Sequence, residues 1–351
     1  MMKRITFCAL LMTLFLLLGC GSGSTKTEDP KTTFLTSIAN LGKGFLDVFT
    51  SLSDMITGAF GIKADTKKED IGAYFTKIAE TMTSVKKKLQ EEVANNGNYL
   101  KLKTVVNTFI TNTLDKIAEG AKTAASGATT DAAIGGAPTA GQDASPAEVA
   151  SVNALVKGIK TMVEVVLKKD EGNSGATKTA EEQQKSIGKL FGTNAADGTE
   201  AHGAAASASI GAVSGADILK AIASSAEAGT GEIKVETAKN AAEIAAAKAE
   251  AAKEITIESA KKDAVIAAGI ALRAMAKGGK FAAKNNEEKS AHAVNGAAAS
   301  AVGKTLSTLI IAIRNTVDSG LKTISDALAT VKQEDKSVEA TTPAETATSG
   351  Q

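Results

Sequence analysis

The 351-residue sequence has little of what would cross-link it or let it bind a metal. It contains two cysteines and two histidines. Cys8 lies in the apolar stretch at the start of the chain, so removal of that stretch would leave a single cysteine and no disulfide. His202 and His292 lie far apart and lack the further ligands that a zinc site requires. We therefore expect no metal site and no cofactor.

Large aromatic side chains and prolines are also scarce. There is no tryptophan, and there are two tyrosines, ten phenylalanines and four prolines. Most aromatics lie in the first third of the chain, so the best-packed core should involve that region. The prolines fall outside the long periodic segments, which are thereby spared a kink. Runs of alternating β-branched and polar residues are absent as well, so the sequence predicts an all-α protein.

The charge balance and the motifs give no sign of nucleic-acid binding or catalysis. Forty basic and 39 acidic side chains leave the chain nearly neutral, whereas a nucleic-acid binder needs a clustered basic surface. Gly296 and Gly303-Lys304-Thr305 have the wrong spacing for a phosphate loop. No nucleophile elbow is present. The pairs Glu91-Glu92 and Glu287-Glu288 are interpreted as solvated or capping charges. We expect no catalytic residue and no enzyme activity.

What the chain does have is an export signal. Lys3 and Arg4 precede an apolar run, Ile5–Leu18, that is shorter than the roughly 20 residues needed to cross a bilayer. This pattern predicts a signal peptide over residues 1–19. The sequence Leu17-Leu18-Gly19-Cys20 resembles a bacterial lipobox, with Cys20 as the acceptor of diacylglycerol and an amide-linked acyl chain. More than one acyl chain would hold the protein firmly on a membrane. The alternative is an ordinary signal peptide that happens to be followed by a cysteine.

The mature chain is expected to have three parts. Residues 20–31 are rich in Gly, Ser and Thr and predict a flexible tether. Residues 32–331 form one helical domain, and the polar tail 332–351 is expected to be disordered.

Apolar residues at helical spacing define the expected helices, and small residues define the expected loops. Helices are predicted over 34–59, 66–95, 102–120, 146–166, 179–191, 232–277 and 285–331. Capping boxes are expected at Thr66 with Glu69, at Ser145 with Glu148 and at Thr179 with Glu182. Loops are expected at 121–145, 172–175 and 192–215. The simplest packing is an elongated multi-helix bundle in which 33–60 packs against 302–331 near the membrane, with the loop-rich end distal.

Three segments carry a family resemblance. Lys261–Phe281, KKDAVIAAGIALRAMAKGGKF, resembles an invariant segment of the variable surface lipoproteins of Borrelia. Ala312–Leu328, AIRNTVDSGLKTISDAL, is similar to the C-terminal block of the variable large proteins, which are related to VlsE. Thr36–Gly61, which contains SIANLGKGFLDVFTSLSDMITGAFG, is similar too.

The resemblance implies a largely helical lipoprotein on the surface of the outer membrane. Such proteins are expressed one variant at a time, and the implied role is antigenic variation that evades host antibody. The implied partners are the outer membrane, through the lipid anchor, and host antibodies. Loops 121–145, 172–180 and 192–236 would then belong to the changing, outward region, while apolar residues on several sides of 261–281 predict that this helix is covered.

An adhesin for a host glycosaminoglycan or protein is the alternative function. Lys86-Lys87-Lys88 could contact a sulfated polysaccharide, but the favoured interpretation of these lysines is a solvated helix face. Arg273, Lys277 and Lys280 raise the same question. Arg273 is expected to extend along the core surface with its charge in water.

Overall fold

The computed structural model describes residues 30–53, 61–97 and 99–332, with side chains described throughout except at 45–53. The predicted signal peptide, Cys20, the tether up to residue 29 and the tail 333–351 lie outside the described residues. The chain divides into two compact units. Unit 1 contains the described residues of Met1–Val48, Lys87–Asn107 and Leu321–Gln351, and unit 2 those of Phe49–Lys86 and Thr108–Gly320.

The described residues confirm the all-α prediction. They contain no strand and only three isolated β-bridges. In chain order the elements are α2 (Pro30–Ser53), α3 (Lys68–Asn95), α4 (Leu100–Phe109), the π-helical turn η2 (Ile110–Leu114), α5 (Asp115–Ala125), α6 (Val149–Val166), α7 (Glu181–Ser186), the 3-10 turn η3 (Ile187–Phe191), α8 (Glu200–Ala212), α9 (Gly215–Ser224), the 3-10 turn η4 (Val235–Thr237), α10 (Ala241–Ala246), α11 (Asp263–Met275) and α12 (Glu288–Ala329).

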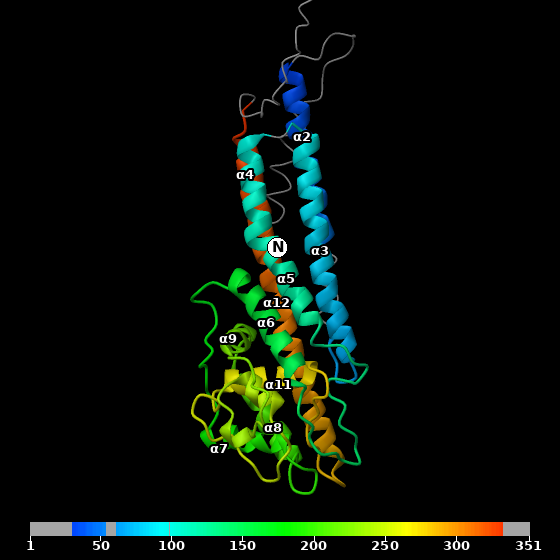
Figure 1. Cartoon of the computed structure of the whole chain (residues 1–351), viewed down its shortest axis with the longest axis vertical. Helices are drawn as coiled ribbons and strands as arrows, with labels where there is room; N and C mark the ends of the chain where they lie inside the picture. The colour runs from blue at the N-terminus through cyan, green and yellow to red at the C-terminus, as the bar shows by residue number, and fades with distance from the viewer. Residues whose placement is uncertain (1–29, 54–60, 98, 333–351) are drawn as a thin grey trace, which may run out of the picture. The chain divides into compact units, whose positions relative to one another are not determined.

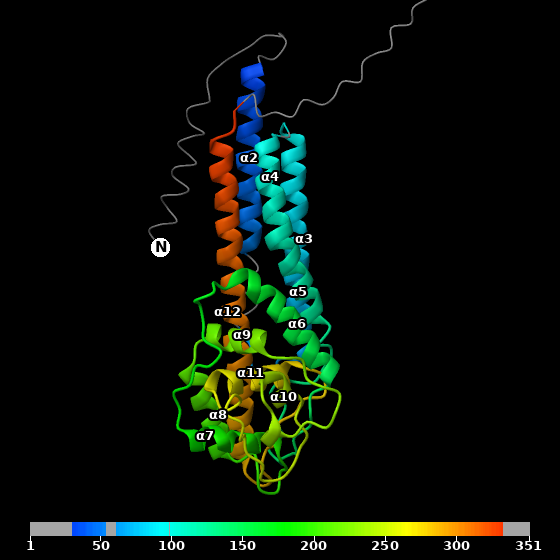
Figure 2. The same cartoon turned by 60° about the vertical axis from the view of Figure 1, so that its left-hand side comes forward.

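Unit 1 is built from four helical segments: α2, the end of α3, most of α4 and the end of α12 (Figure 2). The rings of Phe34 and Tyr99 meet edge-on with 5.7 Å between their centroids. Further along, Gly44 lies against the side chain of Glu92. These contacts make α2 antiparallel to α3. Residues of both terminal helices thus belong to one unit, while their direct contact and their closeness to a membrane stay predictions.

The predicted capping box at the start of α3 is wrong. The N–H of Lys67 donates to the Asp70 carboxylate at 3.0 Å, so the acidic partner is one residue later than Glu69. The next two backbone N–H groups donate to carbonyls in loop 130–132. A distant loop therefore supplies the acceptors that Thr66 was expected to provide. The expected apolar stripe is confirmed, and its side chains are buried: Ile71, Phe75, Ile78, Met82, Val85 and Leu89.

The helix expected to stop near Gly120 continues to Ala125, because this glycine serves a helix crossing instead of a helix end. A Cβ added to Gly120 would lie 2.7 Å from the carbonyl oxygen of Gly158. The two glycines let α5 and α6 approach closely. The predicted start of α6 is also wrong: the helix begins at Val149, and Ser145 instead pairs with Lys280 in an isolated bridge.

The segment 192–215, expected to be a loop, is largely helical. Capping boxes begin α8 at Thr199 with His202 and α9 at Ser214 with Asp217. The segment 232–277, expected to be one long helix, contains the 3-10 turn η4 and two separate helices, α10 and α11. The Thr179 box before α7 is wrong as well, because the N-cap is Ala180. In all three places alanine and short polar residues gave no stripe that could fix the boundaries.

The loop expected at 121–145 is neither wholly loop nor wholly exposed. Residues 121–125 belong to α5, and several of the remaining side chains are buried: Ala128, Ile134, Ala137 and Ala144. Backbone hydrogen bonds tie it to residues 64–66, 192 and 280–283. The prediction that this segment lies freely at the surface is therefore wrong.

The long helix α12 confirms the strongest stripe in the sequence. Its predicted core residues are buried: Val302, Leu306, Leu309, Ile313, Val317, Leu321, Ile324 and Leu328. By length and composition α12 could cross a membrane, as could the bent pair α8–α9 taken as one span. However, 56% of the apolar window of α12 is buried within the protein, which is the pattern of a core helix.

Candidate functional site

The recognised segment 261–281 forms the central helix of unit 2. Every residue of α11 except Val265 is buried. The helix packs against α6, α8, α9 and α10, as Figures 1 and 2 show for this unit. The prediction that this helix is covered by its neighbours is confirmed. A surface that binds a ligand or an antibody cannot form on it in the folded state.

A fully buried carboxylate opens α11. Asp263 accepts hydrogen bonds from the backbone N–H groups of Lys178 and Thr179, and from the hydroxyls of Thr179 and Ser209. Burial would raise the pKa of Asp263, but these hydrogen bonds outweigh it and hold the pKa below its usual value. A negative charge at this helix end also matches the helix dipole.

Two buried cations close the other end of α11. Arg273 is completely buried, so the expectation that its charge reaches water is wrong. Its guanidinium donates to the carbonyl oxygens of Lys280, Ala245 and Ala247 at 2.8–3.1 Å. The guanidinium carbon also lies 4.8 Å from the centroid of the Phe191 ring, which adds a cation–π contact.

The second cation comes from the first residue of α3. The Lys68 amine donates to the carbonyls of Arg273, Ala276 and Gly279 at 3.3, 2.6 and 2.8 Å. These are carbonyls that the end of a helix leaves without partners. Burial first, and then the charges of Arg273 and Lys280, lower the pKa of Lys68 to about 7. Lys68 therefore joins α3 to the end of α11.

This buried polar set could not be found from the sequence. The spacing of Asp263 and Arg273 within one helix was visible, but their partners lie far away in the chain. These groups also have no access for a substrate, since Asp263, Arg273 and Lys68 are each no more than 1% exposed. Their arrangement fixes α11 in place.

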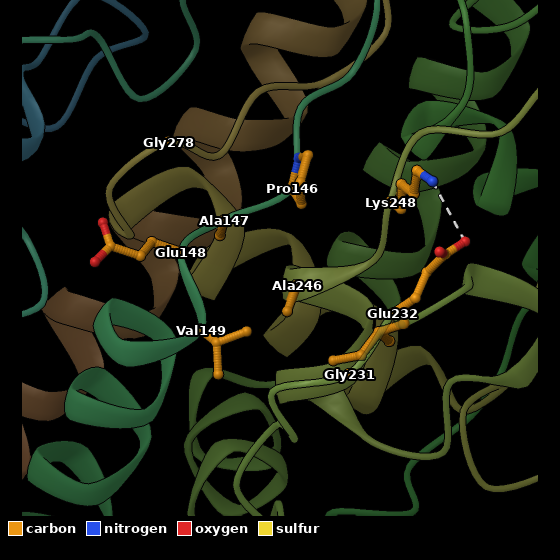
Figure 3. Close-up of a pocket in the computed structure, with 10 residues that line it drawn as sticks. Pro146, Ala147, Glu148, Val149, Gly231, Glu232, Ala246, Lys248 and Gly278 are labelled. Carbon is orange, nitrogen blue, oxygen red and sulfur yellow. Dashed lines mark ion pairs between the residues drawn. The ribbon is translucent and has the colours of Figure 1, made fainter.

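A pocket of about 370 Å³ opens between the start of α6, loop 231–233 and the end of α10 (Figure 3). Its walls are mostly small residues and backbone. Glu232 pairs with Lys248 at 3.3 Å, and Glu148 pairs with Lys277 at 2.9 Å. The charged groups at the rim thus satisfy one another, and the pocket gathers no nucleophile with a base.

Outside the pocket, the longest described stretch without a buried residue is 168–183. It includes the predicted surface segment 172–180. A second region with partly accessible charged side chains consists of residues 232–236, in which Val235 is buried, and residues 248–254. Ion pairs join the two segments. Lys234 pairs with Glu250 at 3.1 Å, and Lys253 pairs with Glu236 at 3.0 Å. Both regions offer charged, accessible side chains to a macromolecular partner.

The lysine run that suggested glycosaminoglycan binding is partly engaged within the protein. Lys86 pairs with Asp115 at 2.8 Å, and Lys87 pairs with Glu91 at 3.7 Å. Both therefore carry a neighbouring negative charge. Glycosaminoglycan binding stays a prediction without a supporting contact.

The structure does not bring together the other polar residues that the sequence singled out. His202 caps α8, and His292 lies 3.6 Å from Glu288 on α12. Glu287 accepts a hydrogen bond from the N–H of Glu200, a capping role. Lys304 donates to a carbonyl at the end of α8. Among the described residues no cluster of three or more potential metal ligands occurs. Cys20 lies outside the described residues.

Comparison with known proteins agrees with the helical fold. The family model described as Borrelia lipoprotein matches residues 45–328. Variable large protein 4 of Borrelia hermsii is 63% identical, with 100% of both chains covered. Variable large protein 17 of the same species is 62% identical, covering 100% of this chain and 99% of its own.

Among solved structures, the Lyme disease variable surface antigen VlsE of Borrelia burgdorferi superposes with a TM-score of 0.73 and 37% sequence identity. The match covers 85% of this chain and 100% of that chain. A family match over most of the chain, full-length relatives and a shared fold agree with one another, and the chain therefore belongs to the Borrelia lipoprotein family.

Proposed function

We propose that this chain is a lipid-anchored protein of the outer-membrane surface whose exposed segments vary and so evade host antibody, without catalytic activity. The proposal rests on a contrast within unit 2 between a buried segment and an accessible one. The segment that resembles the variable surface lipoproteins is buried as α11, whereas no residue of 168–183 is buried. Exposed positions with few buried contacts tolerate substitution, and buried ones do not.

Antibodies raised against peptides test this division. Antibodies to 168–183 should label intact cells and should fail against a variant with a different sequence there. Antibodies to 263–275 should bind denatured protein and leave intact cells unlabelled, because the helix is covered. Strong labelling of intact cells by the second antibody would contradict the proposal and would favour a receptor-binding role for that helix.

The proposed anchor is the lipidated Cys20. Cys20→Ala should move the protein from the detergent phase to the aqueous phase in a phase-partition experiment, because the acyl chains supply the membrane affinity. Cys8→Ala is the matched control, since Cys8 lies in the segment removed with the signal peptide. Retention of the Cys20 variant in the detergent phase at the wild-type level would rule out this anchor.

A further inference from the structure

Two large apolar side chains are exposed at one end of unit 1. Leu100 is 63% exposed and Leu35 is 36% exposed. They come from different helices at the same end of the unit, because the residues just before them, Phe34 and Tyr99, are in ring contact. This is the end of unit 1 at which α2 and α4 begin and α12 ends (Figure 2). We call it the α2-start end.

The described segments at the α2-start end carry only positive charges of their own, although the Glu92 carboxylate reaches Asn96 at 3.0 Å. Exposed lysines occur in these segments: Lys31, Lys101, Lys103 and Lys332. The described residues of 30–40, 96–104 and 327–332 contain no aspartate or glutamate. Acidic residues adjoin this set in sequence at Asp29 and Glu334, outside the described residues. An apolar centre with a basic surround matches a lipid surface, where apolar groups enter the interface and lysines meet phosphates.

The length of the chain before α2 places a membrane within reach of this end. Residues 20–29 separate the proposed anchor from Pro30, the first residue of α2. Ten residues span at most about 36 Å when fully extended. An anchored molecule must therefore keep the α2-start end close to the headgroups, whatever the tether conformation.

We propose that the α2-start end docks on the lipid surface of the membrane that holds the anchor, with Leu35 and Leu100 entering the interface and Lys101 and Lys103 facing the phosphates. This inference rests on the proposed anchor at Cys20. Docking would fix how unit 1 stands on the membrane, a property that the tether alone cannot provide.

The test uses the full mature chain carrying Cys20→Ala, so that binding through acyl chains is absent. The probe is a series of unilamellar vesicles of phosphatidylcholine with and without one-quarter phosphatidylglycerol, assayed by co-sedimentation. The chain should bind weakly and should bind better with the anionic lipid. Joint replacement Leu35→Ser and Leu100→Ser should lower the partition coefficient at least about fivefold, since it removes apolar area from the interface. Lys101→Gln with Lys103→Gln should lower binding to the anionic vesicles by about five- to twentyfold.

Ile311→Ser is the matched control, because Ile311 is a large apolar residue, 45% exposed, that belongs to unit 2. It should leave vesicle binding unchanged. The proposal would be overturned if Ile311→Ser lowered vesicle binding as much as the leucine replacements, or if the chain did not bind vesicles at all. It would also be overturned if sedimentation velocity showed dimers that the leucine replacements abolish. Detergent partition of the wild-type chain reports on Cys20 separately. If the wild-type chain stayed in the aqueous phase while the Cys20→Ala chain still bound vesicles, the proposed anchor would be refuted. The docking surface would still stand.

Discussion

Lys68 and Arg273 show how a buried positive charge can be held mainly by backbone carbonyls, to which Arg273 adds a ring contact with Phe191. In the described part of the chain their hydrogen bonds all go to carbonyl oxygens near the ends of α10 and α11. The C-terminal ends of helices carry partial negative charge, so the two cations meet complementary dipoles. The carbonyls of Ala245 and Lys280 also accept hydrogen bonds from the backbone N–H groups of Ala147 and Ser145. The side-chain donors matter most at the other carbonyls, because an unsatisfied buried polar group costs about 1–3 kcal/mol.

Replacing Lys68 tests this role. Lys68→Met should lower the free energy of unfolding by about 1–3 kcal/mol near pH 7, because three carbonyls lose their donor. The pKa of Lys68 is about 7 in the folded protein and lies near the ordinary lysine value of 10.5 when unfolded. Between these values the unfolded state binds more protons, so stability contributed by Lys68 should rise with pH.

Denaturant unfolding of the wild type and of Lys68→Met between pH 6 and pH 10 measures this effect. The free energy of unfolding of the wild type minus that of Lys68→Met should be constant below about pH 7. Above that pH it should grow by up to about 1.4 kcal/mol per pH unit. If this difference became smaller as the pH rose, the pKa of Lys68 would be higher in the folded than in the unfolded protein, and the expected effect of burial would be wrong.

Arg273 also marks a limit of sequence reasoning at the residue scale. Its apolar neighbours in sequence correctly indicated a helix in the core. Whether its charge reaches water depends on acceptors at 245, 247 and 280, which only the folded chain brings together. The same holds for Asp263, whose partners lie at 178–179 and 209. Cys20 stays a prediction, and it differs in kind because a lipidation motif is contiguous in the sequence.

At the scale of elements, the crossing of α5 and α6 depends on glycines in helix interiors. Gly158 lies against Gly120 and Ala124, and a Cβ there would collide with backbone atoms of α5. Gly158→Ala should therefore destabilise the protein by about 1–3 kcal/mol through overpacking. Gly211→Ala is the control: Gly211 lies in α8 with nothing within 4 Å of an added Cβ. It should stabilise the protein by about 0.5–1 kcal/mol. Thermal unfolding measures both, and equal shifts would contradict the close crossing.

Elements with large side chains could be predicted, and elements made of alanine could not. The stripes of α3, α6 and α12 alternate bulky apolar with polar positions, so burial on one face follows from the pattern. In 192–215 and 232–277 alanine occurs on every side. It favours helix intrinsically but cannot show which face is covered or where a turn falls. Ile255, buried in the irregular segment between α10 and α11, was misplaced for that reason.

At the scale of the whole molecule, the two units have different chain architectures. Unit 2 consists mainly of one continuous stretch, Thr108–Gly320. Unit 1 combines three segments that are far apart in sequence, and its last segment begins at Leu321. Its core includes side chains from each of them, such as Leu41, Leu102 and Ile324. Unit 1 therefore needs the end of α12 to close its core, whereas unit 2 does not.

Truncation after Gly320 tests this dependence by hydrogen exchange. Loss of 321–351 removes Ile324 and its neighbours from unit 1, so amides in peptides covering 87–107 should exchange at least about tenfold faster, equivalent to roughly 1.4 kcal/mol of opening free energy. Amides of α11, which lies within unit 2, should keep their protection. Truncation after Lys332 is the control and should leave both regions unchanged, because it spares all of α12. Equal loss of protection in 87–107 and in α11 would show that the chain opens as one cooperative unit.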